Sequence, residues 1–326
     1  MGKSKLRSPL IYAAICLVLV GSLITFVLGC PGPERKLLQG SQITKRYNAE
    51  PMVTVVEGNG AKQQVKLEKY VEGVVAGEMK SGWPVEAYKA QAILARSYAL
   101  QLLTKDGTQP ATGEISASHK AAQAYKPENI TDPIRKAVKE TRGKVMVAND
   151  KFARAYFHSA SGGKTAKAVD MGLVPKGQEP PYLKQVSARE ELAEAKVKTW
   201  RATFPIAAVE KAARDTGADI KGLKEIAVGR KDNGGRAVTL RLTYSGGVSE
   251  VNANGLRVGL DPEKMQSTML TRINVEGSQV VMEGRGFGHG VGLSQWGAYT
   301  MAKQGKSAED IIKYYFREIK LVQLWK

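Results

Sequence analysis

A long uncharged apolar run near the N-terminus decides where the rest of this chain can fold. It extends from Leu10 to Gly29, and about 20 apolar residues are enough for a helix to cross a bilayer. Three cations precede it, which favours an N-terminus in the cytoplasm: Lys3, Lys5 and Arg7. The alternative is a buried core helix. We predict a membrane anchor at 1–30, a juxtamembrane linker at 31–50 and an extracytoplasmic domain at 51–326.

Both cysteines of the chain, Cys16 and Cys30, lie in this run or just after it. The exported domain therefore contains no disulfide and no cysteine-based metal site. Val27 to Cys30 loosely resembles a lipoprotein cleavage box. A retained helix and a lipidated Cys30 both leave the protein tethered to the outer face of the membrane.

The charge balance points to an anionic partner. Lys and Arg number 49 against 31 Asp and Glu, which gives a formal net charge of +18, and such a surface attracts polyanions. Little nucleic acid is present outside the membrane, so we expect wall polymers or anionic lipid and no nucleic acid. The alternative is that many of these lysines are solvated charges that only keep the protein soluble.

Strands and helices follow one another without a regular βαβ period, which predicts an α+β fold with mixed, mostly antiparallel strands and interspersed helices. Turn sequences at Asn149-Asp150 and at Asp232 to Gly235 predict two hairpins. The expected strands are 52–56, 62–67, 144–148, 152–158, 225–230, 237–244, 279–284 and 321–324. The expected helices are 68–78, 84–105, 132–141, 206–216, 254–259, 294–304 and 308–316.

Glu78 is the first candidate for chemistry. It ends a predicted helix beside Met79 and Trp83, and a carboxyl group in apolar surroundings has a raised pKa. Such a group can hold a proton near neutral pH and deliver it to a glycosidic oxygen. The alternative is an ordinary surface glutamate at a helix end.

The helix after Pro84 carries Lys89 and Arg96 seven residues apart, so they share one stripe two turns apart. Short alanine side chains at Ala92, Ala95 and Ala99 let this helix pack closely. A cationic stripe after a glutamate suits a saccharide carboxylate or lactyl group, and the alternative is a solvated cationic face.

The segment from Phe157 to Lys164 is a polar loop after a strand. It fails the phosphate-loop pattern because His158 stands where the first glycine is needed. Ser161 to Lys164 matches the S-x-x-K of penicillin-binding proteins, but two glycines oppose the helix that this motif requires. A Ser161 peptidase, which would be labelled by a β-lactam, is therefore a remote alternative. His158 is left either as a ligand for sugar hydroxyls or as a structural residue.

Glycine occupies every second position from Gly284 to Gly292. In an extended chain these glycines share one bare face, which admits either a ligand or another backbone. The three histidines, His119, His158 and His289, have no zinc-site spacing, so we predict no metal.

Four segments together resemble the stage II sporulation protein D (SpoIID) family, which includes amidase-enhancer LytB proteins. They are E-K-Y-V-E-G-V-V-A-G-E-M-x-x-x-W-P-V-E-A-Y-K-A-Q-A-I-L-A-R-S-Y-A-L from Glu68, F-H-S-A-S-G-G-K-T from Phe157, P-Y-L-K from Pro181 and G-R-G-F-G-H-G-V-G-L-S-Q-W-G-A from Gly284. The resemblance implies a curved domain with a glycan-binding cleft and no cofactor. It also implies a lytic transglycosylase that cleaves peptidoglycan glycan strands stripped of stem peptides, during engulfment of the forespore.

The resemblance also implies partners and site residues. The partners are a cell-wall amidase (SpoIIP-like) and a multi-spanning membrane protein (SpoIIM-like), with the protein a single-pass protein of the cell membrane whose domain faces the intermembrane space. Glu78 matches the family's catalytic glutamate. The positions that match strand-binding or cleft-lining residues are Lys89, Arg96, Tyr125, His158, Ser159, Ser161, Tyr182, Lys184, His289 and Gln295.

Two details depart from the family pattern. Some members bind zinc through a Cys/His cluster before a Gln-x-Tyr, and here Gln123 and Tyr125 follow Ser116, Ala121 and Ala122 with no cysteine, which again predicts no zinc. Ala160 replaces a more usual threonine. The alternative function is a non-catalytic glycan-binding module that recruits or stimulates an amidase.

Overall fold

The computed structural model describes residues 43, 47, 49–104, 113–118 and 122–326. The chain divides into two units, Met1–Ser41 and Gln42–Lys326, and every described residue belongs to the second. The predicted anchor at 1–30, most of the predicted linker at 31–50, and His119 lie outside the described residues. None of the helices within the described ranges is long and apolar enough to cross a membrane.

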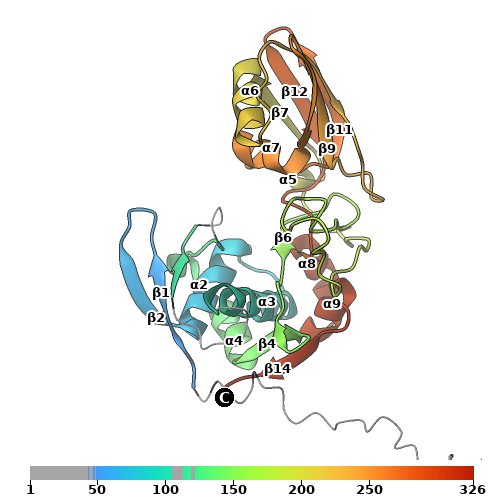
Figure 1. The fold of residues 1–326 in the computed structure, drawn as a ribbon. Coiled ribbons are helices and arrows are strands. Elements are labelled where there is room, and N and C mark those ends of the chain that lie inside the picture. Colours follow the sequence, from blue (N-terminus) through green and yellow to red (C-terminus); the bar gives the residue numbers. More distant parts are fainter. Residues whose placement is uncertain (1–42, 44–46, 48, 105–112, 119–121) are drawn as a thin grey trace, which may run out of the picture. The chain divides into compact units, whose positions relative to one another are not determined.

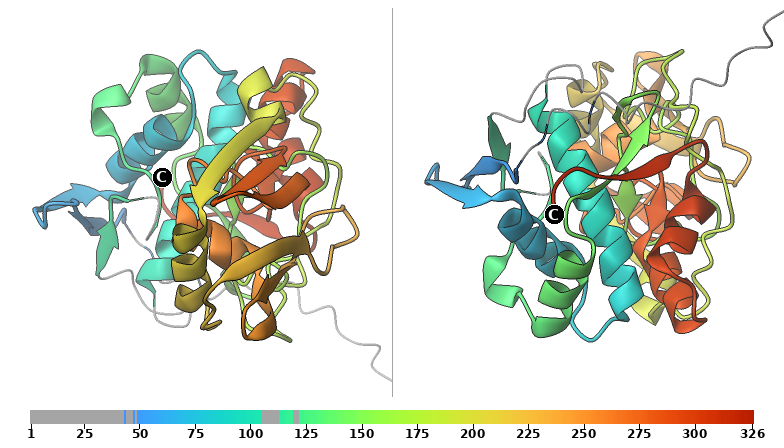
Figure 2. Two further views of the ribbon diagram at one scale, coloured as in Figure 1. Left: turned by 90° about the horizontal axis from the view of Figure 1, so that it is seen from above. Right: turned by 90° about the horizontal axis from the view of Figure 1, so that it is seen from below.

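The first of two hydrophobic cores surrounds α3 (Val85–Leu103). Almost every side of this helix is covered, because alanines alternate with Ile93, Leu94 and Leu100 around its circumference. Helices α2 (Leu67–Glu78), α4 (Asp132–Glu140), α8 (Gln295–Lys303) and α9 (Ala308–Tyr315) pack against it. The alanine-rich sequence thus produces the buried central helix of this core (Figures 1 and 2).

Two three-stranded sheets border this core. In one, β1 (Met52–Val56) pairs antiparallel with β2 (Lys62–Lys66) and parallel with β3 (Glu114–Ser116). In the other, β4 (Lys144–Ala148) lies between β5 (Lys151–Phe152) and the C-terminal β14 (Lys320–Gln323), antiparallel to both. Figure 2, right, shows the red C-terminal strand running beside green β4. The last strand therefore closes the core that surrounds α3.

The second core is built from residues between Trp200 and Met282. One sheet has the order β11 (Leu270–Glu276), β12 (Gln279–Gly284), β7 (Trp200–Pro205), and the other has β10 (Gly247–Asn252), β9 (Thr239–Tyr244), β8 (Leu223–Val228). Helices α6 (Ile206–Asp215) and α7 (Ala253–Leu260) complete it. The chain leaves the first core after the short α5 (Ala195–Lys198) and returns to it after β12.

The α+β prediction, with mostly antiparallel strands, is confirmed. The predicted single strand 152–158 is wrong: β5 is short, and β6 (Phe157–His158) pairs in parallel with β13 (Leu293–Ser294). Several further elements had no prediction, among them β3, β7, β10 and β11. Strand β7 does alternate in burial along W-R-A-T-F-P, so its signal was present in the sequence.

The glycine run does not continue β12 as an extended strand. Gly286, Gly288, Gly290 and Gly292 all have positive φ values, which disfavour other residues. A Cβ on Gly286 would lie 2.6 Å from the backbone nitrogen of Gly162, and one on Gly290 would lie 2.6 Å from the Arg236 guanidinium. Of the two interpretations of this run, the close packing seam is the one that the structure supports.

Candidate active site

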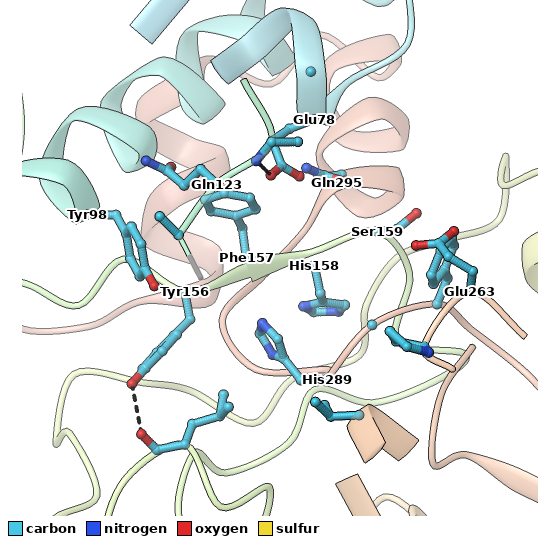
Figure 3. A pocket seen from close by; sticks show the side chains of 18 of the residues that line it. Glu78, Tyr98, Gln123, Tyr156, Phe157, His158, Ser159, Glu263, His289 and Gln295 are labelled. Atoms are coloured by element: carbon cyan, nitrogen blue, oxygen red, sulfur yellow. Dashed lines mark hydrogen bonds between the residues drawn. The ribbon is translucent and has the colours of Figure 1, made fainter. Parts of the chain in front are cut away.

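A pocket of about 760 Å³ lies where the two cores meet. Its wall is formed by the end of α2, the segment 122–126, β6 with Ser159, residues 287–289, the first residue of α8, and α7 with the turn after it. Figure 3 shows Glu78 and Gln295 pointing toward each other on one side, with His158 and His289 grouped on another. Four of the predicted site residues beyond Glu78 therefore line one pocket: His158, Ser159, His289 and Gln295.

Glu78 is the last residue of α2. Burial raises the pKa of its carboxyl group above the ordinary value of 4.5, and the hydrogen bond from the Ala124 N–H and the nearby Gln295 amide act in the opposite direction. The C-terminal end of a helix carries partial negative charge, and the last turn of α2 has no basic residue. Burial and helix polarity therefore both favour the protonated acid.

Two helical glycines bring a partner segment up to this carboxyl. A Cβ on Gly77 would lie 2.5 Å from the Ala124 carbonyl oxygen, and one on Gly73 would collide with the Tyr125 ring. Without side chains there, Lys126 N–H reaches the Gly73 carbonyl at 3.0 Å. Ala124 N–H reaches Glu78 Oε1 at 2.7 Å. Gly73 and Gly77 are four residues apart and so lie on one face of α2. The close approach of residues 124–126 to this face positions the Glu78 carboxyl and shields it from water.

A second pocket, of about 580 Å³, adjoins the first at the same carboxyl. Both pockets are lined by Gly77, Glu78 and Lys126. The second also includes Ser81, Asn129 and Thr131 from the loop before α3 and from the region of the 3-10 turn η3 (Pro127–Asn129). Glu78 therefore stands between two hollows rather than at the bottom of one.

The two histidines of the pocket are neutral. Burial lowers the pKa of His158 well below 6.5, and burial with nearby Arg257 and Arg236 lowers that of His289 to about 3. His158 Nδ1 donates to the Val291 carbonyl at 3.1 Å, because a carbonyl only accepts. Its Nε2 then accepts from Ser161 Oγ at 2.8 Å. Ser161 itself is fully buried, so this pair fixes the ring and presents no exposed nucleophile.

Glu190, which the sequence analysis did not select, holds the loop after β6. Its Oε1 accepts from Ser161 N–H at 2.5 Å and from Ser294 Oγ at 2.6 Å, and its Oε2 accepts from Gly162 N–H at 2.9 Å. Ser294 is also the N-cap of α8, which begins with Gln295. One partly buried carboxyl group thus fixes the strand-end loop relative to Gln295, which lines the pocket with Glu78.

Comparison with known proteins identifies the family of this chain. Residues 57–147 match the family model of Stage II sporulation protein (SpoIID), and residues 182–292 match a domain of unknown function (DUF8618). Stage II sporulation protein D of Bacillus subtilis (strain 168) is 30% identical over 278 residues, which cover 79% of this chain and 75% of that protein. This chain belongs to the stage II sporulation protein D family.

Two other relatives are also similar over most of this chain. An uncharacterized protein of Brachyspira hyodysenteriae is 28% identical over 283 residues, covering 87% of this chain and 72% of that protein. The amidase enhancer of Bacillus subtilis is 27% identical over 290 residues, covering 76% of this chain but only 39% of that protein.

Not all of the SpoIID positions that match this chain come together at the pocket. Arg96 is fully buried, with its guanidinium held by Glu68 at 2.6 Å and by the Lys144 carbonyl at 2.7 Å. Lys89 pairs with Glu86 at 2.7 Å and with Glu140 at 2.6 Å. Neither side chain lines either pocket, so the geometry does not support the prediction that they contact a strand.

The other predicted strand-binding positions also lie outside the two pockets. Tyr125 stacks on Tyr70 with ring centroids 5.4 Å apart. Tyr182 accepts from Arg154 N–H at 2.8 Å, and burial raises its pKa to about 12. Lys184 lies over the Tyr314 ring, 5.7 Å from its centroid. These roles stay predictions.

Several lining residues had no prediction. Tyr98 lies on α3, and burial raises the pKa of its hydroxyl group. Asn254 and Arg257 come from α7 and Glu263 from the turn after it. No sequence pattern distinguishes Arg257, because one arginine among 49 basic residues does not stand out. Across the described ranges, no group of three or more His, Cys, Asp or Glu residues could hold a metal ion.

Proposed function

We propose that this protein is a lytic transglycosylase that cleaves the MurNAc–GlcNAc bonds of denuded peptidoglycan strands during forespore engulfment. The observation that carries the proposal is a single half-buried carboxyl, Glu78, with a raised pKa and a place between two adjoining pockets. Family membership and the overall charge of +18 support a role at an anionic cell wall.

In this mechanism, Glu78 acts first as an acid and then as a base. The protonated carboxyl donates to the oxygen that links MurNAc to GlcNAc, and the C1–O bond breaks through an oxocarbenium-like state. The C6 hydroxyl oxygen of the same MurNAc then bonds to C1, and its proton passes to the Glu78 carboxylate. A 1,6-anhydro ring forms, no water is consumed, and Glu78 ends protonated as it began.

The raised pKa of Glu78 matters because an ordinary glutamate is almost wholly ionised at neutral pH. The hydrogen bond from Ala124 N–H occupies Oε1, which leaves the other carboxyl oxygen to exchange the proton. Gln295 and Ser159 line the same pocket and supply neutral hydrogen-bonding groups for sugar hydroxyls. His158 has both ring nitrogens bonded to Val291 and Ser161, so it shapes the pocket wall instead.

A hydrolase with two carboxylates is the nearest competing reaction. Inverting and retaining glycosidases place the two groups between about 5 and 9.5 Å apart. The second carboxyl that lines the larger pocket is Glu263. Figure 3 shows it apart from the Glu78–Gln295 pair. The single-carboxyl mechanism therefore requires that Glu263→Gln retain activity.

The two pockets flanking Glu78 suit a polymer rather than a small molecule. A strand that passes the carboxyl places sugars in hollows on both sides, and Lys126 borders both hollows. We assign the MurNAc that forms the anhydro ring to one side of Glu78 and the departing GlcNAc to the other.

The proposal extends to location and partners. The apolar run at 10–29 anchors the protein in the cell membrane with residues 51–326 outside. There it works beside a SpoIIP-like amidase, which produces denuded strands, and a SpoIIM-like multi-spanning membrane protein.

A second candidate function follows from one relative that is named an amidase enhancer. In that function the domain binds glycan and recruits or stimulates an amidase without cleaving a bond itself. The pockets would then hold the strand, and Glu78 would only accept hydrogen bonds from it.

The test is incubation of the full-length protein with purified denuded glycan, followed by mass spectrometry of the strand ends. We expect new anhydro-MurNAc ends from the native protein and from Glu263→Gln, and none from Glu78→Gln. Reducing hydrolytic ends, or loss of activity in Glu263→Gln, would favour the two-carboxylate hydrolase. Intact strands that still bind the protein would favour the amidase-stimulating module.

A further inference from the structure

The wall contributed by the second core carries a cation whose role the proposed mechanism leaves open. Arg257 lies on α7, is 7% exposed and lines the larger pocket. Its Nε donates to the Met265 and Gln266 carbonyls at 2.9 and 3.0 Å, and its Nη2 donates to the Pro262 carbonyl at 3.2 Å. An arginine has five N–H donors. Among the described residues, these bonds leave Nη1 and one N–H of Nη2 for a ligand.

The carbonyl groups hold Arg257 in place without neutralising it. Burial and Arg236 lower its pKa to about 10, and Glu263 opposes this, so the guanidinium is charged at neutral pH. Three backbone carbonyls from the turn 262–266 fix its plane, which preorganises the guanidinium. A rigid, charged donor pair suits a carboxylate, which it can bind through two parallel hydrogen bonds.

The remaining charges of the pocket also favour an anion. Besides Arg257, its ionisable lining groups are Lys126, Glu78, Glu263 and the two neutral histidines. When Glu78 holds its proton, two cations face one ionised carboxylate. Fully buried Arg236 adds positive charge behind this wall, since it lowers the pKa of both Arg257 and His289.

Asn254 provides an acceptor on the same face of α7, three residues before Arg257. Its Nδ2 donates to the Met171 carbonyl at 3.0 Å, which fixes the orientation of the amide. Within the described part of the chain, no donor reaches its buried Oδ1. A buried acceptor without a partner is destabilising, and a ligand N–H or O–H would satisfy it.

We propose that Arg257 and Asn254 form a receptor for the muramic acid residue, with Arg257 binding the free lactyl carboxylate and Asn254 Oδ1 accepting from the sugar. This inference rests on the proposed function and adds to it the wall of the pocket that selects strands without peptides. An attached peptide converts the carboxylate into a neutral, bulky amide, which removes the charge that Arg257 recognises. The segment of unknown function, 182–292, would thereby supply substrate selection.

The test compares two forms of one glycan on the full-length Glu78→Gln protein, which leaves the strand uncut. Denuded strands carry free carboxylates, and the same strands after carbodiimide coupling to ammonia carry neutral amides. We expect about tenfold weaker binding of the amidated strands by calorimetry, because the amide lacks the charge that strengthens hydrogen bonds to a guanidinium. Equal binding of both glycans would overturn the proposal, and this comparison needs no change in the receptor.

Variants of the protein then test which residue causes the preference for free carboxylates. Arg257→Gln should abolish the difference between the two glycans, and Arg257→Lys should keep part of it. Arg272→Gln is the matched control, because it removes an exposed arginine of the same core that lines neither pocket, and it should leave the preference unchanged. A folded Arg257→Gln protein, verified by circular dichroism, that still prefers free carboxylates would refute the assignment.

Failure of this inference is distinguishable from failure of the proposed function. Anhydro-MurNAc formation by native protein together with equal binding of both glycans keeps the enzyme and rejects the receptor. Discrimination between the glycans without any cleavage keeps the receptor and rejects the enzyme.

Discussion

At Glu78 the ionised carboxylate is destabilised by burial and by the partial negative charge at the end of α2. Because the folded-state pKa is raised, the folded protein binds more protons than the unfolded chain between the unfolded and the folded pKa. The free energy of unfolding therefore falls as pH rises through that window, whose lower bound is the ordinary value of 4.5. The group that the chemistry requires is one that lowers stability at neutral pH.

We therefore predict that Glu78→Gln raises the melting temperature at pH 7 by a few degrees while it abolishes cleavage. The glutamine Oε1 can still accept from Ala124 N–H, and no charge remains to be buried. The difference in melting temperature should shrink as pH falls toward 4, where the native carboxyl is protonated. Differential scanning calorimetry across this range measures it, and a less stable variant at pH 7 would contradict the desolvation argument.

Arg96 is a predicted strand-binding residue, but its contacts in the structure lie in the core. Its charge is matched in the core by Glu68, which also accepts from Gly143 N–H and from Trp325 Nε1 at 2.9 Å each. Removing one partner of a buried ion pair leaves an uncompensated charge. The residue therefore connects α3 to α2 and to the C-terminal segment.

We predict that Arg96→Met lowers the free energy of unfolding by about 3–5 kcal/mol. Lys89→Met, which breaks a partly exposed pair, should cost only about 1 kcal/mol or less. Urea unfolding measures both. If Arg96→Met were as stable as the native protein and bound glycan poorly, a direct role in strand binding would regain support.

Among the elements, α2 contains two glycines that lower its helix propensity but allow residues 124–126 to approach closely. Glycine inside a helix is about 1 kcal/mol less favourable than alanine, yet Gly73 and Gly77 occupy one face of α2 beneath residues 124–126. This face determines both the distance from Ala124 to Glu78 and the exclusion of water from the carboxyl.

Gly77→Ala is therefore expected to lower kcat at least about tenfold, although alanine is the better helix former. Its Cβ would displace the Ala124 carbonyl and disrupt the bond to Glu78. Anhydro-MurNAc release over time measures the effect. Gly58→Ala is the matched control, because its Cβ would meet nothing within 4 Å; equal rates for the two variants would show that this contact is not needed.

For the whole molecule, the pocket depends on the meeting of the two cores. The second core is tied to the first by Arg236 to the Ser161 carbonyl at 2.5 Å, and by Asn252 and Asn254 to the Asp170 and Met171 carbonyls at 3.0 Å each. These bonds place a basic wall opposite the half-buried acid. The attraction of the pocket for anions therefore depends on the two cores being packed together.

We predict that affinity for denuded glycan falls as salt rises from 50 to 300 mM, because exposed charges are screened over about 10 Å at 0.1 M. An uncharged chitin oligosaccharide should bind with little salt dependence. Fluorescence titration at several salt concentrations measures both. Salt-independent binding of the denuded glycan would mean that the positive charge of the chain does not contribute to recognition.

The sequence by itself determined the class of fold, most helix and strand positions, and the place of Glu78 at a helix end before Trp83. These features depend on neighbours along the chain, through periodicity, turn residues and helix boundaries. It also predicted that His158, Ser159, His289 and Gln295 carry polar groups near one another, through resemblance rather than spacing.

Only the tertiary structure decided which charged groups face the pocket. Arg96 and Arg257 are both buried arginines on helices, but one is paired in the core with Glu68 and the other lines the pocket. The same holds for the glycine run, which is a packing seam against residues distant in the sequence, such as Gly162 and Arg236. Burial and pKa depend on contacts between distant segments, and no local pattern encodes them.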